Sequence, residues 1–302
     1  MHWGQIKTLL ILSFLLLDIY LFTQFLEKKE VADIGVIEHE PSTIEEQLNA
    51  ESITIKELPD QEYEETYISL KQHLFTKDEL KDVSNVPKQE SFILNQNMVV
   101  SILDKEVALP SKKTDANMND FLASFAYYGE EYTFWERNEE KNVLIYFQNK
   151  LDRTIYYNDK GIILVFLNDD NEATHYIQTM LGEEETVAEK RELITPMRAI
   201  ETLYNANALF AGDEITRVNI GFHTRVPFES DVQVFVPIWK ITVNDDHNYF
   251  VNAIEGFIFS TDEEEFFDEV TTTMMKRLDI QKGQNKKLKE ILQDIEERKG
   301  IR

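Results

Sequence analysis

The six histidines are the first residues to consider for catalysis or metal binding. They are His2, His39, His73, His175, His223 and His247. None of them forms a His-Glu-x-x-His motif or another close metal-ligand spacing. The chain contains no cysteine, which excludes disulfides, thiolate metal sites and cysteine nucleophiles. The sequence therefore predicts neither a metal site nor a catalytic site built on these residue types.

Carboxylates and glycines give no stronger sign of enzyme chemistry. With 56 acidic residues, chance carboxylate pairs are inevitable, and no glycosidase-like pair can be selected. The sequence has no Gly-x-Ser-x-Gly elbow, no phosphate loop and no Gly-x-Gly-x-x-Gly turn. Residues 168–172 resemble a calcium loop only in composition, and we interpret them as a hairpin turn. We expect no enzyme activity and no cofactor.

The overall charge limits the kinds of partner. The net charge is −25, from 31 lysines and arginines against 56 acidic residues. A surface of this sign repels nucleic acid, anionic lipid headgroups and anionic wall polymers. We therefore exclude nucleic acid as a partner. The content of 42% hydrophobic and 11% aromatic residues is typical of a folded chain.

Residues 8–26 form an apolar stretch near the start of the chain. Fourteen of these 19 residues are apolar, and a helix of this length nearly spans a hydrocarbon core about 30 Å thick. The alternative is a cleaved signal peptide, which has a shorter apolar region and a small-x-small cleavage site. No such site is visible before Glu27. We predict an uncleaved membrane anchor, preceded by residues 1–7.

Asp18 is the acidic residue within this stretch. A charged side chain inside a bilayer costs about 3 kcal/mol or more, so it usually meets a partner or reaches toward the interface. Both interpretations remain open. If a partner helix is present, we expect it to contact the face formed by Phe14, Leu17, Asp18, Leu21 and Phe25.

The middle of the chain predicts a stalk followed by a folded unit. Residues 27–61 are rich in glutamate and poor in aromatics, which is typical of a stalk. Residues 62–182 predict a helix over 115–125 and then an antiparallel meander. Within the meander, the segments 154–157 and 162–167 flank an Asn-Asp-Lys-Gly sequence, which predicts a hairpin.

Residues 183–270 predict a second unit of the same kind. A helix begins at Thr195, and strands follow, including 232–243, which is apolar on both faces and therefore central. The fold class is α+β, with two units that each place a helix over an antiparallel sheet. Residues 271–302 carry apolar side chains along one side of a charged stretch. We interpret them as a solvated charged tail, with a helix that docks on a partner as the alternative.

An aromatic group surrounds Tyr132 and Trp135. Such a group can line a ligand groove, or it can belong to the core and the sheet surface. The candidate residues for an interaction surface of the domain are Tyr128, Tyr132, Trp135 and Trp239.

Several stretches, in this order and at this spacing, resemble the YycI (WalI) family of Gram-positive bacteria. They are Trp3–Thr8, Thr43–Leu48 with Glu57–Pro59, Tyr128–Trp135, Pro237–Ile241 and Val251–Gly256. The resemblance covers approximately residues 3–260. It implies a single-pass protein of the cell membrane, with a cytoplasmic N-terminus and an extracytoplasmic domain whose last unit is PepSY-like.

The resemblance also implies partners. The family acts with its companion YycH on the sensor histidine kinase YycG (WalK) of the YycFG (WalRK) two-component system, which governs cell-wall metabolism. Control is thought to run through transmembrane helices. We therefore expect a non-enzymatic regulator of the kinase.

Two other functions are possible. A ligand-binding sensor for a cell-wall fragment or peptide predicts a concave, aromatic-lined pocket near Trp135 or Trp239, and a closed core there would oppose it. An enzyme such as a wall hydrolase would require a convergent acidic pair in a deep cleft.

Overall fold

The computed structural model divides the chain into two compact units, Met1–Glu51 and Ser52–Arg302. We describe each unit by itself. The residues that the structure describes are 7, 11–24, 43–59, 63–186, 189–226, 232–260, 262–281, 285–298 and 300.

The first unit contains a helix over residues 11–24 and a short helix α2 (Ile44–Ala50). A capping box starts α2. The Thr43 hydroxyl accepts a hydrogen bond from the backbone N–H of Glu46, and the Glu46 carboxylate accepts one from the backbone N–H of Thr43. This reciprocal pair satisfies donors that a helix start leaves without partners.

The predicted membrane anchor is contradicted by the structure. Among the described residues, no helix has both the length and the apolar character needed to cross a bilayer. Residues 8–10 and 25–26 of the predicted span lie outside the described residues. The prediction of a single-pass protein with an extracytoplasmic domain is therefore wrong.

The second unit is built on a large mixed sheet, which confirms the α+β class. Fourteen strands from the described residues join it, and the main path is β11-β3-β14-β13-β8-β7-β9-β10-β5-β4. In chain order the strands of this path are β3 (Ile68–Lys71), β4 (Gln89–Leu94), β5 (Met98–Ala108), β7 (Val143–Lys150), β8 (Arg153–Tyr156), β9 (Ile162–Leu167), β10 (Glu172–Thr179), β11 (Glu185–Thr186), β13 (Glu214–Val226) and β14 (Val232–Val243).

Four further strands join this sheet beside the main path. They are β1 (Thr54–Ile55) on β13, β6 (Tyr132–Asn138) on β7, β15 (His247–Asn252) on β14, and β16 (Ile258–Phe259) on β15. A separate two-stranded sheet is formed by β2 (Glu64–Glu65) and β12 (Arg191–Glu192). This unit also contains the short helix α3 (Lys77–Ser84) and the 3-10 turn η1 (Gly129–Glu131).

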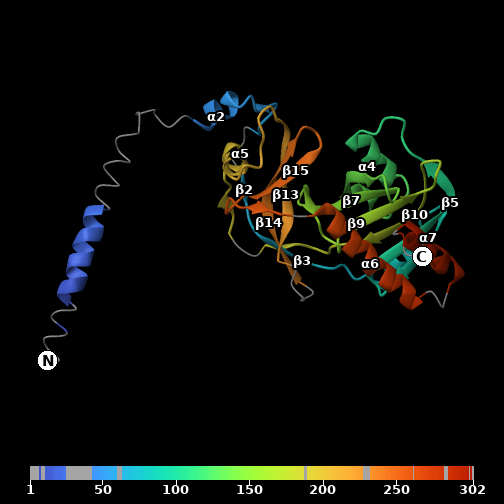
Figure 1. The fold of residues 1–302 in the computed structure, drawn as a ribbon. Helices are drawn as coiled ribbons and strands as arrows, with labels where there is room; N and C mark the ends of the chain where they lie inside the picture. The colour runs from blue at the N-terminus through green and yellow to red at the C-terminus, as the bar shows by residue number, and fades with distance from the viewer. Residues whose placement is uncertain are drawn as a thin grey trace. The chain divides into compact units, whose positions relative to one another are not determined.

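The half of the sheet around β7, β9 and β10 is covered on both faces (Figure 1). Helix α4 (Asp115–Ala123) packs on one face, while α6 (Glu263–Gln281) and α7 (Lys286–Arg298) pack on the other. The side chains of β9 alternate between these two cores. Ile162, Leu164 and Phe166 join the core of α6 and α7, and Ile163, Val165 and Leu167 join the core of α4. The unbroken apolar run of β9 is explained by burial on both faces.

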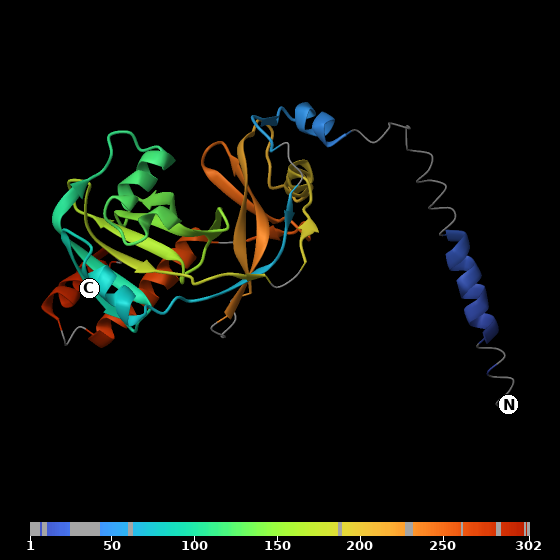
Figure 2. The ribbon, with the colours of Figure 1, turned by 180° about the vertical axis from the view of Figure 1, so that it is seen from behind.

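The C-terminal segment differs from the solvated tail expected for residues 271–302. The apolar residues of α7 are all buried, each at most 5% exposed: Leu288, Ile291, Leu292 and Ile295. The guanidinium of Arg298 donates to the backbone carbonyls of Leu167, at 2.9 Å, and Lys141, at 3.0 Å. Figure 2 shows both C-terminal helices beside β4 and β5. The apolar side of α7 therefore docks on the sheet of its own chain.

The other half of the sheet carries helix α5 (Pro196–Asn205). It starts where the sequence predicts, because the Thr195 hydroxyl accepts a hydrogen bond from the backbone N–H of Arg198. Strand β14 pairs with β13 along one edge and with β15 and β3 along the other, so its predicted central place is confirmed. The PepSY-like character of this part and the domain boundaries at 182 and 270 stay predictions.

Strand β8 does not form the predicted hairpin with β9. It follows β7 through a tight turn at Leu151 and Asp152, whose φ angles are 50° and 56°. Two adjacent positive φ angles are the geometry of a type I′ hairpin turn. The other edge of β8 pairs in parallel with β13, and β9 pairs with β7 and β10 instead. Strand β8 thus joins the two halves into one sheet.

Candidate functional site

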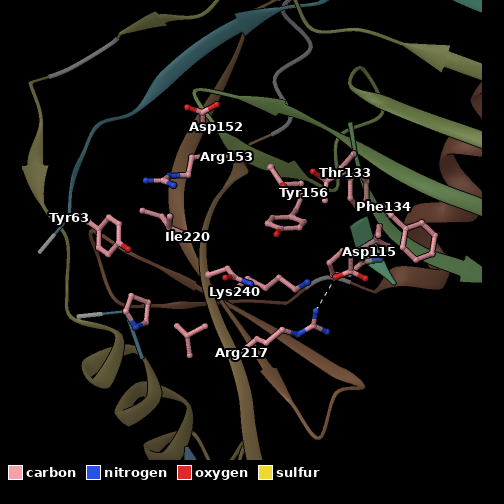
Figure 3. Close-up of a pocket in the computed structure, with 16 residues that line it drawn as sticks. Tyr63, Asp115, Thr133, Phe134, Asp152, Arg153, Tyr156, Arg217, Ile220 and Lys240 are labelled. Atoms are coloured by element: carbon pink, nitrogen blue, oxygen red, sulfur yellow. Dashed lines mark hydrogen bonds and ion pairs between the residues drawn. The ribbon is translucent and has the colours of Figure 1, made fainter. Parts of the chain in front are cut away.

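A cavity of about 340 Å³ opens where β8 joins β13 (Figure 3). Its walls come from β6, β7, β8, β13 and β14, with the first residue of α4 at the rim. The volume lies near the lower end of the range for small-ligand pockets, roughly 300–1,000 Å³. The side chains that give it its chemical character are Tyr63, Trp135, Arg153, Tyr156, Arg217 and Lys240.

The cavity lies along one edge of β13. Strand β14 occupies the opposite edge along nearly the whole length of β13. On the cavity side, β1 pairs at residues 214–215 and β8 at residues 222–223. Between them, no strand of the described residues pairs with residues 216–221 on that side. The cavity is lined by four consecutive residues of β13: Arg217, Val218, Asn219 and Ile220. Since successive strand residues point to opposite faces, contact with all four indicates that the cavity reaches this edge of the strand.

Lys240 is the central cation of the cavity. Its Nζ lies 4.3 Å from the centroid of the Trp135 ring and 5.5 Å from that of Tyr156. Contacts at this distance are cation–π interactions. In the part of the chain that the structure describes, its ammonium group has no carboxylate within ion-pair distance. Burial lowers the pKa of Lys240 to about 8, and the neighbouring Arg217 cation acts in the same direction.

The two arginines of the cavity have acidic neighbours. Arg217 Nη1 lies 3.1 Å from a carboxylate oxygen of Asp115, as the dashed line in Figure 3 marks. Arg153 Nη2 lies 3.8 Å from Glu65, and its Cζ lies 5.8 Å from the centroid of the Tyr63 ring. The Nε of Arg153 is buried and has no hydrogen-bond partner among the described residues. An unsatisfied buried donor costs about 1–3 kcal/mol. Arg153 and Lys240 therefore both hold donors that a ligand can use.

Asp115 and Asp152 are the acidic residues that line this cavity. Asp115 is committed to Arg217. Glu136 and Glu263 lie nearby but do not line the cavity. Burial raises the pKa of Glu136 to about 7, with a further contribution from the charge of Glu263. Glu263 accepts a hydrogen bond from the Tyr157 hydroxyl. In the described residues, no group of three or more His, Asp or Glu side chains could hold a metal ion.

A comparison with known families identifies the chain. The family model described as "YycI protein" matches residues 33–254, which is most of the sequence. The chain belongs to the YycI family. Membership in the YycI family ties the chain to the YycFG two-component system, and this family consists of regulatory proteins, not enzymes. The resemblance seen in the sequence is thereby confirmed.

The other comparisons add little. No curated protein matches this YycI-family chain. Among solved structures, the chain is similar to an uncharacterized protein from Eubacterium rectale, with 8% sequence identity and a TM-score of 0.42. The similarity covers 70% of this chain and 91% of the other.

The structure separates the four residues predicted as an interaction surface. Trp135 lines the cavity, and Tyr128 is 44% exposed elsewhere. Tyr132 and Trp239 are each 1% exposed, and the polar group of each donates to a backbone carbonyl. These two residues therefore belong to the core of the YycI-family domain. A partner contact of Tyr128 or Trp135 stays a prediction.

The residues predicted to contact a partner helix lie in the first unit. Phe14, Leu17 and Leu21 are 60%, 48% and 55% exposed, and Asp18 is exposed as well. Phe25 lies outside the described residues. Contact of this face with another protein stays a prediction.

Sequence reasoning missed Lys240, Arg153 and Arg217. A signal was present for Lys240, which is the charged residue of the otherwise uncharged strand β14. A lone charge in a strand that is apolar on both faces indicates either a special contact or a cavity. No spacing rule links Lys240 to Arg153, because their proximity depends on the parallel pairing of β8 with β13.

Proposed function

We propose that the chain regulates the sensor histidine kinase YycG, together with a YycH-like protein, by binding and not by catalysis. The observation that carries this proposal is the YycI family match over residues 33–254. Through the kinase, the chain acts on cell-wall metabolism. The cavity supports a non-catalytic role because Asp115, one of the two acidic residues that line it, is ion-paired with Arg217.

The contact surface in this proposal is one face of the helix over residues 11–24. Phe14, Leu17 and Leu21 share that face with Asp18, and their side chains are exposed. Clustered exposed apolar side chains are typical of binding surfaces. A bound protein shifts a kinase toward one state only by as much as it binds that state more tightly.

Co-purification from cells tests this proposal. The full-length tagged chain should recover the kinase and the YycH-like protein. Leu17→Glu should reduce that recovery by at least fivefold, because it places a charge on the contact face. Leu16→Glu is the matched control, since Leu16 is 60% exposed on the opposite side of the same helix. Equal recovery by both variants would exclude this face, and failure of the unaltered chain to recover the kinase would refute the proposal.

A second function, a sensor for a cell-wall fragment or a peptide, is favoured by the cavity at Trp135. The sensor hypothesis requires an aromatic-lined pocket near Trp135 or Trp239. The core is closed at Trp239, whereas Trp135 borders the cavity together with Lys240. Titration with soluble wall fragments should therefore change the tryptophan fluorescence of the full chain. Trp135→Phe should remove the change, and a response that persists in Trp135→Phe would place the ligand elsewhere.

A further inference from the structure

We propose that the cavity binds a short extended peptide as an added strand along β13, with the peptide's C-terminal carboxylate facing Lys240. This inference rests on the second function, ligand sensing, and specifies the class of ligand and its mode of binding.

The geometry of β13 supplies the first argument. The four residues of β13 that line the cavity, 217–220, span about 13 Å at roughly 3.3 Å per residue, which suits about four extended residues of a peptide. The edge of a strand presents backbone N–H and C=O groups that can pair with another chain. Addition of a peptide strand to such an edge is a recurrent mode of recognition. Among the described strands, β1 pairs with β13 before this stretch and β8 pairs with it after, while Pro59, which follows β1, also lines the cavity.

The two flanking strands indicate the direction of the peptide. Strands β1 and β8 both run parallel to β13. A peptide that continues their line between them has its N-terminus near β1 and its C-terminus near β8. The gap closes at Gly221, where an added Cβ would lie 2.9 Å from the Thr154 carbonyl oxygen. The C-terminus of a parallel peptide therefore lies at the end of the cavity where β8 begins with Arg153.

The positive charges of the cavity favour the C-terminal carboxylate of the peptide as the group that they bind. Lys240 pairs with Asn219 across the β13–β14 register and lines the same cavity as Asn219. Its ammonium group has no carboxylate within ion-pair distance among the described residues, and the Nε of Arg153 has no hydrogen-bond partner there, so both can donate to a carboxylate. Asp115 and Asp152 line the rim and repel further negative charge. The cavity thus suits a ligand with one carboxylate and disfavours a polyanion.

The aromatic side chains provide the pockets that such a peptide needs. Successive peptide residues point to opposite faces of the sheet. One row of its side chains meets Trp135 and Tyr156, while the other row meets Tyr63 and Ile220. Main-chain hydrogen bonds then give affinity, and these alternate contacts give sequence preference.

The first experiment uses two arrays of random pentapeptides attached through their N-termini. One array ends in a free carboxylate and the other in a carboxamide, and both are probed with the full-length tagged chain. We expect binders on the carboxylate array that bind at least tenfold more weakly as carboxamides. Lys240→Met should remove this difference, Lys240→Arg should keep it, and Lys105→Met, which alters an exposed lysine on β5, should leave it unchanged.

The second experiment tests strand addition itself. The best pentapeptide is made with N-methyl groups on its odd-numbered amides and, separately, on its even-numbered amides. Only one edge of an added strand faces β13, so one pattern should weaken binding at least tenfold and the other should not. These comparisons alter the peptide and do not depend on how a protein variant folds.

Three outcomes would overturn the inference: no pentapeptide binds, the carboxamides bind equally well, or both methylation patterns have the same effect. In a parallel experiment, the full-length chain is titrated with glucuronic acid, a carboxylate that is not a peptide. If it binds with the same dependence on Lys240 while no peptide does, strand addition is refuted and ligand sensing stands. If neither ligand binds and kinase recovery is normal, only the sensor function fails.

Discussion

Replacing Leu292 with alanine tests whether α7 completes the core of the sheet. Leu292 is 4% exposed and belongs to the same buried cluster as Phe166 and Ile177 of the underlying strands. Truncation of a buried leucine to alanine costs about 2–5 kcal/mol, depending on how far the surroundings relax. Because α7 is a single outer layer that can move inward, we expect about 3 kcal/mol. This is close to a hundredfold change in the unfolding equilibrium constant.

The assay is equilibrium unfolding of the full chain in urea, followed by circular dichroism. Lys289→Ala is the matched control, because Lys289 is exposed on the same helix, and its free energy of unfolding should change by about 0.5 kcal/mol or less. Amide hydrogen exchange adds a local readout, in which Leu292→Ala should speed exchange in β9. A Leu292→Ala variant as stable as the Lys289→Ala control would refute the docking of α7.

Three further predictions concern single residues. Gly221→Ala should destabilise the chain by about 1–3 kcal/mol in urea unfolding, because the new Cβ would lie 2.5 Å from the Tyr156 ring; an unchanged midpoint would contradict the close approach. Burial lowers the pKa of His175 to about 4, so its folded form favours the neutral ring, and stability should fall as pH drops from about 6.5 toward 4. His175→Gln should lose less stability over that range, and parallel curves would count against this assignment. Burial raises the pKa of Glu136 to about 7, so the free energy of unfolding falls as pH rises from about 4.5 through 7. Because solvent partly screens this carboxylate, the free energy of unfolding of Glu136→Gln should exceed that of the unaltered chain by about 1–2 kcal/mol at pH 8, and the two should be equal at pH 4.

Local patterns in the sequence predicted many individual elements. Strands 162–167 and 232–243 coincide with β9 and β14, and the helix start at Thr195 is confirmed. The covering of the sheet was not predicted. The apolar run of β9 indicates burial on two faces, and a single helix can cover only one of them. The apolar side of α7 could have been predicted to cover the second face. The charged residues of the segment obscured this match.

The pairing of β8 shows where local patterns mislead. Asn158–Gly161 is rich in turn-forming residues, but the hairpin forms instead at Leu151 and Asp152, with residue types less suited to positive φ. Strand β8 then pairs with β13, far along the chain. The cavity depends on this non-local pairing, so its residues could be found only in three dimensions. The membrane prediction is contradicted on separate grounds, because no helix among the described residues combines the length and the apolar character that a membrane span needs.

Regulation of the sensor kinase is tested most directly by the phosphorylated fraction of the response regulator of the YycFG system. This fraction can be measured in cells by gel separation of the phosphorylated and unphosphorylated forms. We predict that deletion of the chain shifts the fraction at least twofold, that the unaltered chain restores it, and that Leu17→Glu does not. A fraction that is the same with and without the chain would contradict the proposed role.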